Sequence, residues 1–195
     1  MTHIERIRTL IENHNGVVTS AMLTENNIPR LYLKKLTDSG ELICVCRGIY
    51  VSTDSWEDEM FILQAKFPKG IFSHETALYI HNLTDRTPMK YSMTFPHGYH
   101  TVSVSEENIT ERHSIKDLYY LGITTANSPC NNKIKLYNIE KTLCDIVKSN
   151  CDVQIVNEAM KRYAKSKDKN IKLLYEYAEI LRVKNKISNY MEVLL

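Results

Sequence analysis

The sequence predicts an α+β protein, in which a winged helix-turn-helix is followed by a mixed α/β domain that ends in a helical segment. Three observations predict this class. Residues 16–51 read as helix, tight connection, helix and short hairpin. Short β-rich runs separated by turn residues follow between residues 71 and 137, and residues 151–195 have helical apolar periodicity. We place the domain boundary in the polar stretch near residue 53, which gives domains 1–52 and 53–195.

The first helix is predicted over residues 2–14. Thr2 and Glu5 have the spacing of a capping box at its start. Asn15-Gly16 is expected to end the helix, because glycine tolerates the left-handed conformation of a C-cap. Its apolar residues recur at helical spacing, at Ile4, Ile7, Leu10 and Ile11.

A second and a third helix are predicted on either side of a Glu-Asn-Asn turn. Thr19 or Ser20 caps the second helix, and Pro29 occupies the first position of the third, where its missing N–H costs nothing. Leu33 and Leu36 share the face that packs on the other helices. The opposite arc carries Arg30, Leu31, Lys34, Lys35 and Asp38.

A hairpin follows, with β-rich runs at 42–46 and 49–51 on either side of Arg47-Gly48. An arginine at the tip of such a wing reaches a phosphate or the minor groove. On the third helix, Arg30 and Lys34 lie one turn apart with Lys35 alongside, which suits guanine edges or phosphates, and Leu31 suits a thymine methyl. Surface helices also carry Lys and Arg for solvation alone, but the adjacent wing favours DNA binding.

The second domain begins with a predicted helix over 56–67. Ser73 is expected to cap a helix over 74–83, and a further helix is expected over 139–147. Strand-like runs lie at 91–95, 101–104, 118–123 and 133–137, and the C-terminal helices are predicted at about 152–164, 170–183 and 186–195.

Composition narrows the function classes. The net charge is only +2, so any DNA surface has to be local. No apolar run approaches the roughly 20 residues that span a bilayer, and the N-terminus lacks a signal peptide, so we expect a cytoplasmic protein without membrane contact. The five cysteines are odd in number and have no CxxC spacing, which indicates reduced, mostly buried thiols.

Metal and catalytic sites are weakly supported. His74 and His81 lie seven residues apart without an HExxH motif, so structural or capping roles are favoured over a metal site, and no cofactor is expected. Glu140, Lys141 and Asp145 suggest a nuclease-like cluster. However, Lys141 and Asp145 have the spacing of a surface ion pair, which favours a structural role. We expect no enzymatic activity.

The C-terminal helices carry a basic run with few acids. The run is either a solvated face or a second surface for DNA or an acidic protein. Its candidate residues are Lys161, Arg162, Lys165, Lys169 and Lys172.

Three blocks of the chain, in order, resemble the AbiEi family of antitoxins. The segment from IPRLYLKKLTDSGEL to ICVCRGIYV resembles the family's winged helix-turn-helix. IFSHETALYIHNLTD resembles its Ser-His-Glu-Ser/Thr-Ala-Leu helix, and KLYNIEKTLCDIV its Glu-Arg/Lys-Thr-Leu-x-Asp helix.

The resemblance implies a transcriptional autoregulator and antitoxin of a bacterial type IV toxin–antitoxin, abortive-infection system. In such a protein the N-terminal domain binds inverted repeats in its own promoter, a role carried here onto Arg30, Lys34, Lys35 and Arg47. The C-terminal domain counters a nucleotidyltransferase-like toxin without a stable complex. Two alternatives stay open: a winged-helix regulator whose second domain senses a ligand or dimerises, and a DNA-processing enzyme that docks through the winged helix.

Overall fold

A computed structural model describes residues 1–99, 104 and 107–194 and shows two compact units. The first unit comprises Met1–Pro68 with Asn127–Ile134, and the second comprises Lys69–Ala126 with Lys135–Leu195. Residues 53–68 therefore fold with the N-terminal unit, whereas the sequence places the domain boundary after residue 52. Independent folding of domains 1–52 and 53–195 stays a prediction. The predicted strand at 101–104 lies, except for Val104, outside the described residues.

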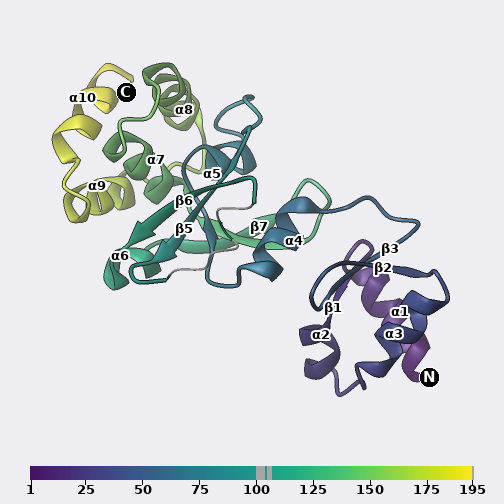
Figure 1. Ribbon diagram of the computed structural model, residues 1–195. Helices are drawn as coiled ribbons and strands as arrows, with labels where there is room; N and C mark the ends of the chain where they lie inside the picture. Colours follow the sequence, from purple (N-terminus) through teal and green to yellow (C-terminus); the bar gives the residue numbers. More distant parts are fainter. Residues whose placement is uncertain (100–103, 105–106, 195) are drawn as a thin grey trace. The chain divides into compact units, whose positions relative to one another are not determined.

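The first unit begins with three helices and a three-stranded sheet (Figure 1). The strands run in the order β1-β3-β2 and all pair antiparallel. This arrangement is consistent with the predicted winged helix-turn-helix. The elements are α1 (His3–Asn13), β1 (Val17–Thr19), α2 (Ser20–Glu25), α3 (Leu31–Asp38), β2 (Leu42–Cys46) and β3 (Ile49–Ser52).

Local signals for these elements are confirmed. The Thr2–Glu5 capping box is formed, with the Thr2 N–H donating to the Glu5 carboxylate over 2.7 Å. Thr19 caps α2 by accepting from the Met22 N–H. Gly16 has φ +91°, and a Cβ added there would lie 2.1 Å from the Ser55 Cβ, so this position requires glycine. The helices bury one core, made of Ile7, Val18, Leu23, Ile28, Leu33, Leu36 and Leu42.

Helix α4 (Glu59–Lys66) begins three residues later than the sequence predicts. Trp56, expected within it, lies before the helix and is 90% exposed. The start moves because the Asp58 carboxylate accepts a hydrogen bond from the Phe61 N–H and thereby caps the helix. Residues Phe61, Ile62 and Ala65 pack against Val17, Ile49 and Val51 of the sheet.

Asp58 also fixes residues 127–134 within the first unit. It is buried, and its Oδ2 accepts hydrogen bonds from the Ser128 hydroxyl and from the Asn132 side-chain amide, the latter over 2.8 Å. The Ser128 hydroxyl oxygen in turn accepts from the Asn132 backbone N–H. One carboxylate therefore holds two segments that are about seventy residues apart.

We expect Asp58→Ala to lower the free energy of unfolding by about 2 kcal/mol, since it removes a cap and leaves two buried donors without an acceptor. Urea denaturation measures this loss. Asp54→Ala is the matched control, because Asp54 is exposed and does not cap α4. Equal stability of both variants would contradict the role of Asp58.

The second unit contains a five-stranded sheet in the order β6-β5-β4-β8-β7. Strand β5 pairs antiparallel with β4 and parallel with β6, and β4 pairs parallel with β8. Figure 1 shows α7 to α10 gathered together beside β5 and β6. The elements are β4 (Ile71–Phe72), α5 (His74–Ile80), β5 (Tyr91–Pro96), β6 (Ile109–Ser114), α6 (Lys116–Tyr120), β7 (Ile123–Asn127), β8 (Lys133–Tyr137), α7 (Ile139–Lys148), α8 (Val153–Lys165), α9 (Ile171–Ile180) and α10 (Lys184–Leu194).

Helix α6 replaces the strand expected at 118–123. Tyr119 is buried there, and its hydroxyl donates to the Lys69 carbonyl over 2.6 Å, so tertiary packing overrides the local β preference. Strand β6 was not predicted, because its sequence ITERHS is polar. It lies at the edge of the sheet, where Glu111 and His113 alternate toward solvent. The predictions for β5, β8 and α7 are confirmed.

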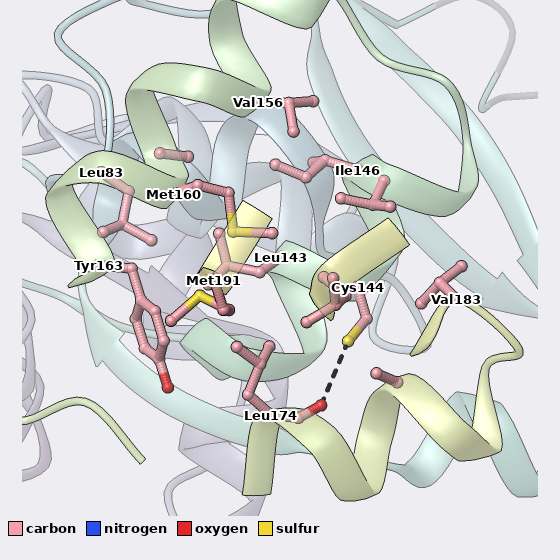
Figure 2. Packing of buried hydrophobic residues seen from close by; sticks show 14 of the residues in the cluster. Leu83, Leu143, Cys144, Ile146, Val156, Met160, Tyr163, Leu174, Val183 and Met191 are labelled. Atoms are coloured by element: carbon pink, nitrogen blue, oxygen red, sulfur yellow. Dashed lines mark hydrogen bonds between the residues drawn. The ribbon is translucent and has the colours of Figure 1, made fainter. Parts of the chain in front are cut away.

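Helices α5, α7, α8, α9 and α10 contribute side chains to the main core of the second unit (Figure 2). Leu143 and Met160 lie at the centre of the cluster, and the Cys144 thiol points toward the Leu174 carbonyl, 3.8 Å away. Of the five cysteines only Cys144 is fully buried, so the prediction of mostly buried thiols is wrong. Within the described residues, no helix is both long and apolar enough to cross a membrane.

Candidate DNA-binding surface

Helix α3 separates a buried face from an exposed basic face, as the sequence predicts. Leu33 and Leu36 are buried, whereas Leu31 is 55% exposed. Lys34 and Lys35 are also exposed. The helix begins at Leu31 with Arg30 as its N-cap residue, two residues beyond the Pro29 start expected from sequence. The ammonium of Lys35 lies 5.3 Å from the centroid of the Tyr32 ring, a cation–π distance that steadies the lysine.

Arg30 is positioned by α2 through side-chain contacts. Its Nε and Nη2 donate to the Thr24 hydroxyl oxygen over 3.1 and 2.8 Å. The Thr24 hydroxyl donates onward to the Ser20 carbonyl over 2.9 Å. The Ser20 N–H then donates to the Gly48 carbonyl over 2.8 Å, within the turn of the wing. These bonds join Arg30 to the residue that follows Arg47.

Arg47 is exposed in the two-residue turn between β2 and β3. Gly48 has φ +81°, which lets the strands reverse within this turn, and the pairing of β2 with β3 is irregular between Cys44 and Cys46. A Cβ added at Gly48 would lie 3.3 Å from the Ser20 hydroxyl, so the turn packs closely on α2. Arg30 and Gly48, the residue after Arg47, thus both bond to α2.

Ser20 and Thr24 were not among the predicted site residues. Their signal is weak, because a serine and a threonine four residues apart are common on short helices. Two basic residues near this region are engaged elsewhere: Arg8 forms a two-bond pair with Glu41, at 3.1 Å for each bond, and Arg6 donates to the Asn26 carbonyl.

The predicted C-terminal basic residues do not share one role. The Arg162 guanidinium bonds the Asp85 carboxylate, contacts Glu158 at 2.8 Å, and donates to the Asn82 carbonyl. The hydrogen bond from Arg162 and its positive charge lower the pKa of Asp85 below its usual value. Lys161, Lys165 and Lys172 are exposed, and the Lys169 ammonium donates to the Ser166 carbonyl over 3.3 Å.

The acid–lysine cluster is buried. Lys141 and Asp145 are 3% and 8% exposed, and the lysine Nζ lies 2.6 Å from each carboxylate oxygen. The expectation of a surface ion pair is therefore wrong: the i,i+4 pair forms, but neighbouring helices cover α7. Burial raises the pKa of Asp145, and the Lys141 ammonium opposes that rise. Glu140 accepts hydrogen bonds from the Tyr163 hydroxyl and the Asn170 N–H.

His74 and His81, the two histidines considered for a metal site, each contact a polar group of the protein. His81 Nε2 lies 2.8 Å from the Tyr137 carbonyl, which requires that nitrogen to donate, and burial lowers the pKa of the ring. His74 Nδ1 lies 3.0 Å from the Ser73 hydroxyl oxygen. Across the described part of the chain, no group of three or more His, Cys, Asp or Glu side chains is arranged to hold a metal ion.

The N-terminal segment matches a known protein family. Residues 5–53 match the family model described as "Transcriptional regulator, AbiEi antitoxin". The AbiEi resemblance of this segment is confirmed. The matched residues contain most of α1 and all of the elements from β1 to β3, including Arg30, Lys34 and Arg47. The two further AbiEi-like blocks, at 71–85 and 135–147, lie outside the match, and their resemblance stays a prediction.

Two other comparisons do not identify a function. The search of curated proteins returned no match. A solved structure, titled "Crystal structure of RV2827C protein from Mycobacterium tuberculosis", is similar with a TM-score of 0.48 and 12% sequence identity. The similarity covers 98% of this chain and 81% of that one.

Proposed function

We propose that this chain is a cytoplasmic AbiEi-type antitoxin that represses its own operon. Its N-terminal unit binds inverted repeats of double-stranded DNA in the promoter. The observation that carries the proposal is the pairing of the family match at residues 5–53 with an exposed basic face on α3 that is linked to the wing through α2. We assign the chain no catalytic activity.

The chemistry of DNA contact follows from the exposed side chains. Lys34, Lys35 and Arg47 are exposed. The Arg30 guanidinium is oriented by its hydrogen bonds to the Thr24 hydroxyl. Lysine and arginine neutralise phosphates, and arginine also pairs with guanine edges. Leu31 offers an apolar contact for a thymine methyl. Four cations support only modest affinity, so two copies on an inverted repeat would double the phosphate contacts.

We expect the double variant Arg30→Gln, Lys34→Gln to weaken promoter binding about tenfold or more, since each lost phosphate or base contact contributes on the order of 1 kcal/mol. A gel-shift titration at fixed salt measures this, with the melting temperature as the check on folding. The control Lys116→Gln, Lys133→Gln removes the same charge from exposed positions off this surface. Equal affinity of both double variants would exclude α3 as the DNA reader.

The antitoxin role is proposed for the second unit, against a nucleotidyltransferase-like toxin with which it forms no stable complex. Lys161, Lys165 and Lys172 are the exposed members of the predicted basic run. We retain Arg162 and Lys169 as neighbours that shape this surface, because the structure engages both of them with other groups.

Co-expression with the neighbouring toxin gene tests this role. The full chain should restore growth, and the triple variant Lys161→Gln, Lys165→Gln, Lys172→Gln should lose rescue while it still shifts promoter DNA. A chain that binds DNA yet never restores growth would favour the alternative, a regulator whose second unit senses a ligand. One observation favours that alternative, namely the polar cavity described next.

A further inference from the structure

The second unit contains a polar cavity of about 350 Å³ that neither DNA binding nor antitoxin action uses. It is lined by the start of α5, by β5 and β6, and by one face of α7. The two sequence blocks singled out at 71–85 and 135–147 meet here. The polar and charged residues on which the argument depends are His74, Thr94, Arg112, Lys141, Asp145 and Lys148.

Four of these side chains, His74, Thr94, Lys141 and Asp145, are buried although they are polar or charged. Lys141 and Asp145 form the 2.6 Å ion pair, and the Lys141 ammonium also lies 4.5 Å from the centroid of the Tyr137 ring. His74 is 7% exposed and has φ +49°, a left-handed conformation that is uncommon for a residue other than glycine. The opposite face of α7 packs Leu143, Cys144 and Ile146 into the apolar core.

The Arg112 side chain has a hydrogen-bond donor without an acceptor. Its Nε is buried, and among the described residues no hydrogen-bond partner lies within reach. A buried N–H without an acceptor is costly, and native structures rarely leave one unpaired. The guanidinium charge also contributes to lowering the pKa of His74, which places the two groups within electrostatic reach of each other.

The hydrogen bonds around His74 define a second donor. The Thr94 hydroxyl donates to the Ser73 hydroxyl oxygen over 2.9 Å, which leaves the Ser73 O–H to donate to His74 Nδ1. Burial, the Arg112 charge and the Lys141 charge lower the pKa of His74 to about 3. The ring is therefore neutral near pH 7, and in the tautomer whose Nδ1 accepts from the Ser73 hydroxyl the ring proton is on Nε2.

We propose that this cavity binds a phosphate-type oxyanion, free or as part of a small nucleotide, with Arg112 Nε–H and His74 Nε2–H as donors. The cations Arg112, Lys141 and Lys148 outnumber the carboxylates of Asp145 and Glu111 on the lining. Glu111 contacts His113 over 3.0 Å, and Asp145 is paired with Lys141. The cavity volume lies within the range of small-molecule sites and leaves room for an organic group beside the phosphate.

Titration calorimetry on the full chain tests the proposal, with inorganic phosphate and AMP as separate probes at constant ionic strength. We expect saturable binding of one phosphate per chain, and tighter binding of AMP would identify a nucleotide as the source. Arg112→Gln should weaken binding about tenfold or more, because a charge-assisted bond is lost. Lys116→Gln removes the same charge from an exposed helix and should bind normally.

A second measurement does not depend on the folding of any variant. In the ¹⁵N-labelled wild-type chain, phosphate should shift amide resonances of His74, of β6 and of α7. Shifts spread over surface lysines, or no saturable binding of either probe, would overturn the proposal, as would undiminished binding by a folded Arg112→Gln protein. DNA binding by α3 is unaffected by any of these outcomes, because its residues belong to the first unit.

Discussion

Asp145→Leu should lower the free energy of unfolding by about 3–5 kcal/mol, because it leaves the Lys141 ammonium buried without its carboxylate. Lys141 Nζ contacts both Asp145 oxygens at 2.6 Å, and neither residue is more than 8% exposed. The Tyr137 ring, 4.5 Å away, cannot replace a full negative charge. Equilibrium unfolding in urea at neutral pH measures the loss.

The double variant Asp145→Leu, Lys141→Met is the decisive control. Replacing both partners with apolar side chains of similar size removes the unpaired charge, so most of the lost stability should return. Lys148→Met is a matched single substitution on the same helix, where the lysine is exposed, and it should change stability little. If Asp145→Leu were as stable as Lys148→Met, the pair would be too solvated to carry this energy.

The sequence predicts the first unit well because the signals there are local. Thr2 and Glu5 form their capping box within one helical turn, and Asn15 and Gly16 follow the end of α1 with positive φ angles. Leu33 and Leu36 face inward because the helical period places them on one side. The capping box and the spacing of Leu33 and Leu36 each depend on neighbours fewer than five residues away.

Features that depend on distant residues were missed. The cap that starts α4 is local, from Asp58 to Phe61, but the bonds from Asp58 to Ser128 and Asn132 span about seventy residues. The helix around Tyr119 depends on a hydrogen bond to the Lys69 carbonyl, and local β preference pointed to a strand. The i,i+4 spacing of Lys141 and Asp145 predicted their contact, but burial depends on helices that fold over α7.

The candidate DNA surface likewise combines features that local sequence predicts with features that depend on tertiary packing. Helical spacing placed Arg30 and Lys34 on an exposed arc, whereas the contact from Arg30 to Thr24 comes from the packing of α3 on α2. In the C-terminal basic run, the sequence does not reveal which basic residues are paired with acids. Arg162 looked equivalent to Lys161 in sequence, yet it forms bonds with Asp85 and Glu158.

Acidification should destabilise the second unit through His74. The pKa of this ring is lowered from 6.5 to about 3 in the folded chain, so between these values the unfolded state binds the extra proton. The stabilising contribution is present above about pH 6.5 and is lost as the pH falls toward 3. A shift of one pKa unit corresponds to about 1.4 kcal/mol, so the loss from pH 7 to about pH 4.5 is about 3 kcal/mol.

The comparison that isolates His74 uses His74→Asn, because asparagine tolerates the positive φ at this position and does not titrate. Neighbouring groups titrate in both proteins: His81 has a lowered pKa and acts in the same direction, and so does Glu75, whose carboxylate is hydrogen-bonded by Cys151 and Ser92. The effect of His81 largely cancels when the two pH profiles are subtracted, whereas part of the Glu75 effect depends on the charge of His74 and remains in the difference.

Unfolding should be followed in a phosphate-free buffer, because an oxyanion in the cavity would itself stabilise the folded state. The wild-type profile should fall more steeply than that of His74→Asn by about one proton per molecule between pH 6 and about pH 4. Parallel profiles would mean that His74 is protonated without penalty in the folded chain, which conflicts with its burial beside Arg112 and Lys141. Adding phosphate should then raise the stability of the wild type more than that of Arg112→Gln, which would link acid sensitivity and anion binding to the same buried cluster.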